Sequence, residues 1–446
     1  MKSSISYKNA LKTLEKHMLV DGFPIVWDYE ASHGNILVDG ATGKEYLDLF
    51  GFFASNPLGH NHPKLTQNDA ADELARVAPL NPSNSDIYTV EMAEFVETFM
   101  STAVPKPFEH VFFVAGGAMA VENAIKAAFD WKVKKNFAAG LKEEKGLQVI
   151  HFKEAFHGRS GYTLSLTNNI AAKISDHYPK FNWPQIDNPK VNFPIEEHLE
   201  EIELAEANAV AQIEQAFADN PDDIAAILIE PIQGEGGDNH FRPEFLQKLK
   251  DLADSHEAML IFDEVQTGLG GTGSWWAFQQ LGVTPDMVCF GKKTQVCGFF
   301  AGPKIDEVDD NVFTHSGRIN STWGGNLVDM VRSKHYIQII EEDHLLAKSS
   351  AVGTLLLDGL KQLQQTYPEM ISNVRGMGLF CAFSLSTTEQ RNDLVSALFQ
   401  QGVLIPGVGA NSVRFRPALT LTDEEATMAL DAIENVIQSI TLAKVG

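Results

Sequence analysis

The sequence predicts an α/β protein, in which a mostly parallel β-sheet is covered by helices on both faces. Short, wholly apolar segments alternate with longer segments of helical periodicity between residues 110 and 291. Strands that are apolar throughout are buried on both faces, which is typical of parallel sheets. The composition is that of a globular chain, because 44% of the 446 residues are hydrophobic and 21% are charged.

The elements of this central region follow one another in a regular order. The expected strands are short and apolar, and the expected helices carry apolar residues at helical spacing. Pro243 stands in the first turn of its helix, a position that tolerates proline. The sequence predicts strands at 110–115, 147–152, 224–231, 258–265 and 286–291, and helices at 118–135, 199–217 and 243–257.

The C-terminal part has a different pattern, which indicates a separate α+β lobe. The extended segment 26–50 is expected to pair with this lobe. We therefore predict an N-terminal segment (1–60) that joins the small domain, a large domain (61–330) and a C-terminal small domain (331–446). The lobe is predicted to contain helices at 345–367, 392–402 and 423–440, and strands at 378–385, 403–406 and 412–420.

Charge and cysteine content exclude several classes of function. The net charge of −24 repels phosphate backbones and anionic lipid heads, so we expect neither nucleic acid nor a membrane as a partner. The N-terminal sequence lacks the apolar segment of a signal peptide, and no apolar stretch is long enough to span a bilayer. The three cysteines form no C-x-x-C pair. We expect a cytoplasmic protein in which they are buried as small hydrophobic residues.

Two motifs suggest functions that we reject. Gly268–Gly273 fits the G-x-G-x-x-G pattern of nicotinamide-dinucleotide enzymes, but the bulky sequence SWWAFQQLG follows it instead of a helix that begins on the glycines. We interpret these glycines as a close-packed turn. His60 and His62 lie close together, but no cluster of further ligands accompanies them, so we predict no metal site.

Ionisable side chains stand where two predicted strands end, which is where ligands bind in such sheets. Asp263 lies in the apolar strand at 258–265, where a carboxylate is costly unless it meets a cation. Lys292 and Lys293 directly follow the strand at 286–291. Burial lowers the pKa of a lysine amine and makes it nucleophilic. Adjacent side chains point in opposite directions in an extended chain, so only one lysine reaches a given site, and this reasoning leaves both open.

Further residues complete the requirements of one cofactor. Gly117 and Ala118 stand between a strand and a helix, where backbone N–H groups can approach a phosphate. Phe156 follows the strand at 147–152 and is suited to stacking on a ring, and Gln266 can donate a hydrogen bond. With Asp263 and a lysine, these residues match the needs of pyridoxal 5'-phosphate, which are an amine, an acid, a phosphate cradle and a flat stacking group.

Three charged residues are candidates for contacts with a substrate. Arg414 and Arg416 lie on one face of a β-like segment, and a guanidinium fork suits a carboxylate. Alternatively, one of the two arginines is only a surface charge. Glu235 is surrounded by glycines, which would allow its carboxylate to move.

The motifs of the chain, in their order, resemble those of class III aminotransferases of pyridoxal-phosphate fold type I. The resemblance covers nearly the whole chain, from LGHNHP to VRFRPALT. It implies a large domain with a mostly parallel seven-stranded sheet, a small domain built from both termini, and a homodimer whose subunits share their active sites. The motifs are AFHGRSGYT (155–163), IEPIQGEGG (229–237), IFDEVQTG (261–268), FGKKTQ (290–295) and STWGGN (321–326).

The resemblance also implies a role for each site residue. Lys292 matches the lysine that binds the cofactor covalently, Asp263 the acid at the pyridine nitrogen, and Gln266 the partner of the phenolic oxygen. Ala118 departs from the family, because many members have a hydroxyl residue there. The remaining matches are Phe156 as the stacking ring, Gly117 and Ala118 as the phosphate-binding backbone, Thr322 as a phosphate contact from the other subunit, and Arg159, Gln266, Arg414, Glu235 and Asn320 as substrate contacts.

Within the family, four segments resemble lysine 6-aminotransferases more than the ornithine or 4-aminobutyrate enzymes. The implied reaction transfers the 6-amino group of L-lysine to 2-oxoglutarate and yields 2-amino-6-oxohexanoate and L-glutamate. Glu235 is expected to pair with Arg414 while lysine is bound and to swing away for 2-oxoglutarate. Ornithine or 4-aminobutyrate aminotransferase activity and a fold-type I aminomutase remain alternatives. The segments are 81–99, 234–246, 290–298 and 320–330.

Overall fold

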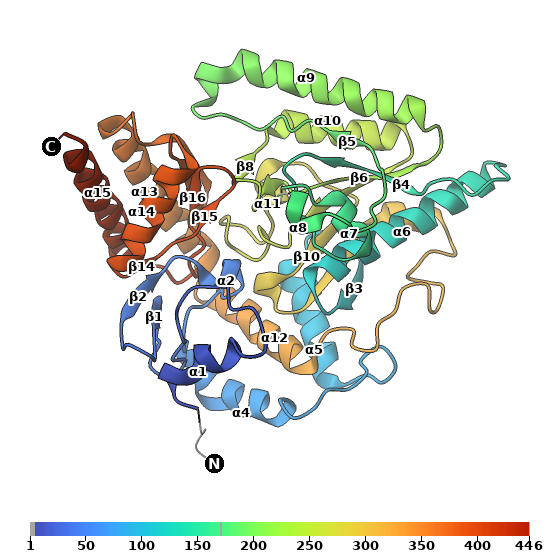
Figure 1. The fold of residues 1–446 in the computed structure, drawn as a ribbon. Coiled ribbons are helices and arrows are strands. Elements are labelled where there is room, and N and C mark those ends of the chain that lie inside the picture. Colours follow the sequence, from blue (N-terminus) through green and yellow to red (C-terminus); the bar gives the residue numbers. More distant parts are fainter. Residues whose placement is uncertain (1–4, 170–171, 446) are drawn as a thin grey trace.

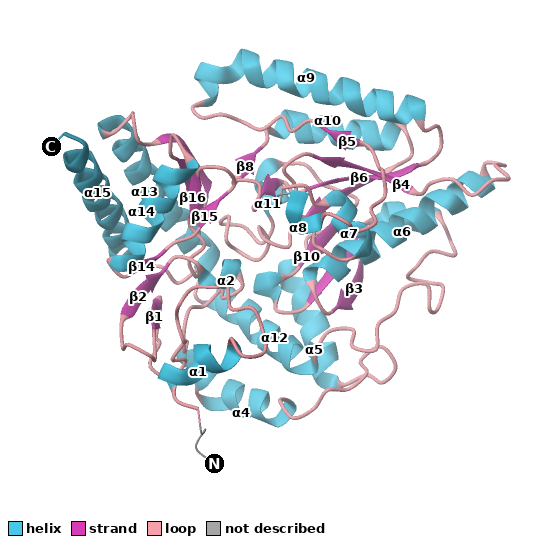
Figure 2. Cartoon of the chain, in the orientation of Figure 1, coloured by secondary structure: helices cyan, strands magenta, loops and turns pink. Residues whose placement is uncertain are grey.

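A seven-stranded sheet forms the centre of the protein (Figures 1 and 2). The structure is a computed structural model that describes residues 5–169 and 172–445. All strands are parallel except β11, which pairs antiparallel with both of its neighbours. The predicted, mostly parallel sheet is therefore confirmed. The strand order is β3 (His110–Val114), β11 (Cys297–Ala301), β10 (Met287–Phe290), β9 (Met259–Asp263), β6 (Ile224–Ile229), β4 (Gln148–Phe152) and β5 (Gln185–Ile186).

The elements predicted for this region are present within a few residues of their expected bounds. The helices are α6 (Gly117–Ala138), α9 (Ile195–Asp219) and α10 (Pro243–Ser255), and α10 has its proline in the first turn. Two strands of the seven-stranded sheet, β5 and β11, were not predicted. β5 has only two residues, and β11 contains Gly298, where an added Cβ would lie 2.0 Å from the carbonyl oxygen of Phe112. A close approach between two strands at a glycine does not produce the alternation of apolar and polar residues by which a strand is recognised in a sequence.

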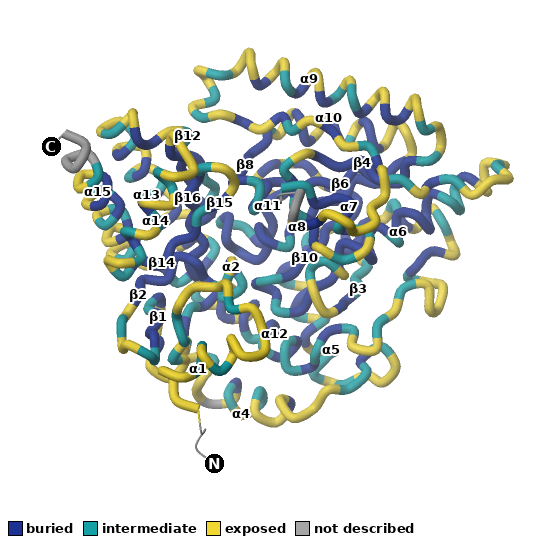
Figure 3. Tube along the Cα trace, in the orientation of Figure 1, coloured by how far each residue is buried: buried dark blue, intermediate teal, exposed yellow. Residues whose placement is uncertain are grey.

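Both faces of the sheet are buried, and the alternation of side chains assigns them to two cores. Leu260 and Phe262 of β9 belong to the larger core, whereas Met259 and Ile261 belong to the core that α6 covers. Asp263 continues the alternation of Met259 and Ile261. It therefore lies at the carboxyl end of its strand on the same side of the sheet as α6. Figure 3 shows the continuous burial of these central strands.

A second, four-stranded sheet lies in the C-terminal part, and the N-terminal strands join a third sheet beside it. Leu47 pairs with Val403, so the expected pairing of the first sixty residues with the C-terminal lobe is present (Figure 1). The exact domain bounds stay a prediction. The four-stranded order is β12 (Ser372–Met377), β13 (Phe380–Ser384), β16 (Ser412–Arg414) and β15 (Gly407–Val408), and the third sheet is β1 (Ile36–Val38), β2 (Glu45–Asp48) and β14 (Val403–Leu404).

Helices of both parts complete the fold. α12 connects the two lobes and packs against α4 and α5. Within residues 5–169 and 172–445, no helix is both long and apolar enough to cross a bilayer. The helices are α1 (Tyr7–Leu14), α2 (Gly51–Ala54), α3 (Pro63–Thr66), α4 (Asn68–Val77), α5 (Val90–Thr98), η1 (Phe99–Ala103), α7 (Gly161–Leu166), α8 (Ala172–Ser175), α11 (Ala277–Leu281), η2 (Lys292–Thr294), η3 (Pro303–Glu307), α12 (Leu327–Glu342), α13 (Leu345–Thr366), α14 (Thr388–Gln400) and α15 (Asp423–Val445), and a two-stranded sheet joins β7 (Ile232–Gln233) to β8 (Asn239–His240).

The glycine-rich segment 268–273 forms a turn between β9 and α11, and no helix begins on its glycines. Glu264, which precedes it, accepts hydrogen bonds from the backbone N–H groups of Ala277 (2.7 Å) and Phe278 (2.9 Å). The interpretation of these glycines as a close-packed turn is therefore confirmed. The cysteines Cys289, Cys297 and Cys381 are buried and unpaired, as expected.

Candidate active site

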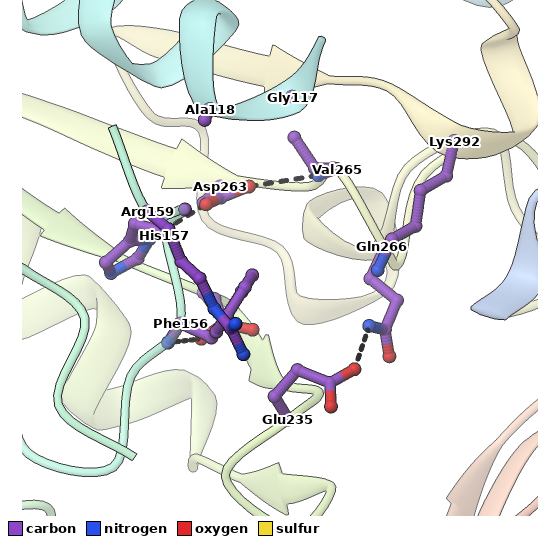
Figure 4. Close-up of a pocket in the computed structure, with 12 residues that line it drawn as sticks. Gly117, Ala118, Phe156, His157, Arg159, Glu235, Asp263, Val265, Gln266 and Lys292 are labelled. Atoms are coloured by element: carbon purple, nitrogen blue, oxygen red, sulfur yellow. Dashed lines mark hydrogen bonds and ion pairs between the residues drawn. The ribbon is translucent and has the colours of Figure 1, made fainter. Parts of the chain in front are cut away.

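A cavity of about 330 Å³ opens at the carboxyl ends of β4, β6, β9 and β10 (Figure 4). Many of the residues predicted from the sequence line it, and residues without a predicted role line it as well. The predicted residues are Gly117, Ala118, Phe156, Arg159, Glu235, Asp263, Gln266 and Lys292. The others are His157, Gly158, Glu230 and Val265.

Asp263 is held at the cavity wall by two hydrogen bonds. His157 Nδ1 lies 2.8 Å from Asp263 Oδ2, and the backbone N–H of Val265 donates to Oδ1 over 3.1 Å. A carboxylate only accepts hydrogen bonds, so the proton of this contact lies on His157 Nδ1. Sequence reasoning assigned no role to His157, although it stands beside Phe156 in the motif AFHGR. Its side chain fixes the orientation of Asp263.

The two adjacent lysines point in different directions. Lys292 enters the cavity, and within the described part of the chain its Nζ has no hydrogen-bond partner (Figure 4). Burial lowers the pKa of the Lys292 amine to about 8, although the nearby Glu235 carboxylate acts in the opposite direction. Lys293 is buried behind the cavity, and its Nζ donates to the carbonyl oxygen of Gln266 over 3.0 Å. Only Lys292 is therefore placed to react with a ligand in the cavity.

The first turn of α6 brings backbone N–H groups to another side of the cavity. Gly116, with φ at 102°, turns the chain into the helix that begins at Gly117, and the first turn contains no acidic residue. A Cβ on Gly117 would lie only 2.9 Å from Val265 Cγ1, so glycine permits this close approach. N–H groups in a first helical turn lack acceptors within the helix and favour anions. Gly117 and Ala118 thus provide a site suited to a phosphate.

The loop after β4 supplies an aromatic ring and a cation. The guanidinium carbon of Arg159 lies 5.9 Å from the centroid of the Phe156 ring, and both side chains line the cavity across from Lys292 (Figure 4). Glu230 anchors this loop, because it accepts from the backbone N–H of Phe156 over 2.9 Å and from that of Gly234 over 2.9 Å. Burial raises the pKa of Glu230 to about 7. Sequence reasoning gave Glu230 no function, although it lies at the end of the strand predicted at 224–231.

Glu235 and Arg414 form an ion pair beside the cavity. Arg414 Nη2 lies 2.7 Å from Glu235 Oε1, and Gln266 Nε2 donates to the same oxygen over 3.2 Å. Burial acts to raise the pKa of Glu235, but the Arg414 guanidinium, the nearby Lys292 and the hydrogen bond from Gln266 together lower it. Arg414 and Arg416 are both buried, so the alternative that one of them is a surface charge was wrong. Ionic partners account for their position, because Arg414 pairs with the partly buried Glu235 and Arg416 with the buried Asp238.

The two remaining predicted residues are not part of this cavity. Asn320 and Thr322 lie in the exposed segment before α12, away from the cavity lining. The side chain of Asn320 accepts a hydrogen bond from the backbone N–H of Ser321 over 2.7 Å. A single copy of the chain therefore does not bring these two residues to the other predicted site residues.

Comparisons with known proteins agree with one another. Residues 19–437 match the family model described as "Aminotransferase class-III". The L-lysine-epsilon aminotransferase of Mycobacterium tuberculosis H37Rv is 49% identical over 431 residues, which cover 96% of this chain and 95% of that protein. The mitochondrial 4-aminobutyrate aminotransferase of Sus scrofa is 32% identical, with coverages of 92% and 84%. The structure of lysine aminotransferase from M. tuberculosis in the internal aldimine form superposes with a TM-score of 0.95, at 48% identity, covering 98% of this chain and 100% of that one.

Lys293 predicts a dependence of stability on pH. Burial lowers the pKa of its amine from 10.5 to about 7, so between these pH values the unfolded chain binds one more proton than the folded protein. Stability therefore increases as the pH rises through this window. Lys293→Met removes the contribution. We expect the thermal unfolding midpoint of the wild type, relative to that of Lys293→Met, to increase between pH 7 and pH 9 in calorimetry.

The exposed Lys248 on α10 provides the matched control. Lys248→Met should change the unfolding midpoint equally at both pH values, because an exposed amine has nearly the same surroundings in both states. A wild-type advantage over Lys293→Met that is constant or decreases with pH would contradict the assignment of Lys293 as a buried, neutral amine.

Proposed function

The chain belongs to the class III aminotransferase family, and on this premise we propose that it transfers the 6-amino group of L-lysine to 2-oxoglutarate. The products are 2-amino-6-oxohexanoate and L-glutamate. The observation that carries the proposal is the similarity to L-lysine-epsilon aminotransferases, at 49% identity over nearly the full length. Identity to a 4-aminobutyrate aminotransferase is lower, at 32%, so 4-aminobutyrate aminotransferase activity is the less favoured alternative.

The side chains around the cavity fit pyridoxal 5'-phosphate, the cofactor of the family. Lys292 offers an amine without a partner among the described residues, and Gly117 begins a helix free of acidic residues in its first turn. Asp263 is a buried carboxylate whose orientation is fixed by His157. When bound, the cofactor supplies an electron sink that stabilises negative charge on the carbon next to the reacting nitrogen.

We assign each residue a role on this basis. Lys292 Nζ attaches the cofactor and carries a proton during transfer, for which an amine with a pKa of about 8 is well suited. Asp263 keeps the ring nitrogen protonated, and Gln266 Nε2 donates to the phenolic oxygen. Phe156 covers the ring. The backbone N–H groups of Gly117 and Ala118 bind the phosphate.

The ion pair between Glu235 and Arg414 addresses a conflict between the two substrates. The reacting carbon of lysine carries no carboxylate, whereas that of 2-oxoglutarate does. Arg414 would be an unpaired buried charge beside lysine, and leaving such a charge unpaired costs several kcal/mol. Glu235 neutralises it at 2.7 Å and moves away when the carboxylate of 2-oxoglutarate takes its place. We assign Arg159 to the distal carboxylate of each substrate.

We further propose a homodimer with shared active sites and a division into segments 1–60, 61–330 and 331–446. Thr322 and Asn320 are exposed, which suits a role in the active site of a second copy. Exposed apolar side chains lie in the same segment as Thr322 and in the segment after Asn84. A hydrogen bond from Asn84 Nδ2 to the carbonyl oxygen of Gly325 holds these two segments together. These side chains are Ile87, Tyr88, Val90 and Trp323, each at least half exposed. A second copy would cover them.

Initial rates with three amines test the substrate. With 2-oxoglutarate as acceptor, we expect kcat/KM to be highest for L-lysine, with ornithine and 4-aminobutyrate lower by at least about tenfold, which corresponds to about 1.4 kcal/mol of transition-state binding. A higher value for either competitor would contradict lysine as the substrate. Conversion of an amine without any 2-oxo acid would instead indicate an aminomutase.

Reduction of the holoenzyme with borohydride, followed by peptide mapping, tests the attachment site. We expect the reduced cofactor on Lys292, because its amine faces the cavity while that of Lys293 is bound to backbone carbonyls. A label on Lys293 would overturn the assignment. If the protein remains unlabelled after incubation with excess cofactor, the proposal that it uses pyridoxal 5'-phosphate would be contradicted.

Replacing Glu235 tests the ion pair. In Glu235→Ala, we expect the single-turnover rate with lysine to fall by about 10²-fold or more, because Arg414 is left unpaired, while the rate with 2-oxoglutarate changes only several-fold. Glu235→Gln keeps the shape and loses the charge, so the same selective loss would identify charge as the cause. Equal losses in both half-reactions would refute the role of Glu235.

A further inference from the structure

Arg416 is a buried cation that the proposed function leaves without a role. Its guanidinium pairs with the carboxylate of Asp238, with Nη1–Oδ2 at 2.9 Å and Nη2–Oδ1 at 2.5 Å. Its guanidinium carbon lies 3.2 Å from the centroid of the Phe380 ring. Burying a cation this completely is costly unless its hydrogen bonds are satisfied. Arg416 also donates hydrogen bonds to Gln266, which lines the cavity.

The carboxamide oxygen of Gln266 accepts hydrogen bonds from two arginines. Arg416 donates through Nε (3.0 Å) and Nη2 (2.9 Å), and Arg414 donates through Nη1 (3.1 Å). A guanidinium has only donors, so the side of the amide that faces both arginines must be the oxygen. The NH₂ group of Gln266 consequently points the other way, toward the cavity and Glu235 Oε1. The arginines thus determine which end of the amide the cavity meets.

The two arginines differ in what happens to them during the reaction. Under the proposed function, Arg414 exchanges Glu235 for a substrate carboxylate, so its ionic partner changes with the bound substrate. The ion partner of Arg416, Asp238, is fully buried on the far side of the glycine turn. Arg375 fixes that end of the turn, because it donates to the carbonyl oxygens of Gly237 and Asp238. Arg416 therefore keeps its contacts in both half-reactions.

From this geometry, and resting on the proposed function, we propose that Arg416 is a positioning residue that holds the Gln266 amide with its NH₂ group toward the phenolic oxygen of the cofactor. Gly234 supports this arrangement, because a Cβ there would lie 2.3 Å from Gln266 Oε1. The amide is thus confined between a glycine and a fixed guanidinium. Its donor is available whether Glu235 is paired or displaced, so the electronic state of the ring is the same for both substrates.

A pH titration of the visible absorption of the holoenzyme tests the proposal. N–H donation stabilises an anionic oxygen and lowers its pKa, so losing the oriented donor raises the titration midpoint. Arg416→Lys keeps the charge but loses the planar fork. We expect the midpoint to rise by about one pH unit in Arg416→Lys and in Gln266→Ala. The double variant should rise no further than Gln266→Ala alone, because Arg416 acts through Gln266.

Two further variants make the outcome decisive. Arg242→Lys alters a similar arginine–carboxylate pair, in which Glu206 of α9 lies at 2.6 Å and neither residue lines the cavity, and should leave the midpoint unchanged. If Arg416→Lys does not fold, Asp238→Asn removes only the charged anchor and should raise the midpoint in the same direction. An unchanged midpoint in a folded Arg416 or Asp238 variant, or additive shifts in the double variant, would overturn the proposal. A wild type that binds no cofactor would instead contradict the proposed function itself.

Discussion

The arrangement of the site depends on burying both faces of the central sheet, which leaves only the ends of its strands for polar chemistry. β9 and β10 pair in parallel with Cys289 opposite Asp263, so Lys292 emerges just beyond the level of that carboxylate. The same edge carries Glu230 after β6 and the loop with His157 after β4. Charges that are unfavourable within the sheet are thus gathered where they can be paired with one another or with a ligand.

In this low-dielectric region, most charged side chains lie next to a partner that offsets the cost of burying them. Asp263 is oriented by His157, Arg414 is paired with Glu235, and Arg416 with Asp238. Lys292 Nζ has no ion-pair or hydrogen-bond partner among the described residues, and burial lowers its pKa to about 8, which leaves a neutral amine accessible near physiological pH. This amine is the group that we propose to react with a ligand in the cavity. Its reactivity follows from the partners that its neighbours have and it lacks.

Periodicity and strand-end chemistry predicted the parallel strands, Asp263 and the phosphate-suited turn at Gly117, because these features follow from local sequence. The choice between Lys292 and Lys293 required the resemblance, since it depends on the backbone carbonyls of Gln266 and Gly268, more than twenty residues away. The role of His157 and the contacts of Arg416 were not predicted for the same reason. Their partners lie 106 and 150 or more positions away in the chain, and no local pattern encodes such contacts.

The turn that carries Glu235, the residue that we propose to move, is itself held in place by close packing and by hydrogen bonds. Close packing excludes a side chain at Gly234, where a Cβ would meet Gln266, and at Gly236, where it would lie 2.4 Å from the carbonyl oxygen of Glu154. The far end is held by Arg375 and by the buried pair of Asp238 with Arg416. Motion of the turn as a whole would break these contacts, so the proposed exchange of partners at Arg414 would be confined to the side chain of Glu235. The three arginines come from β12, from β16 and from the residues that directly follow β16, so the C-terminal sheet supplies the cations beside Glu235.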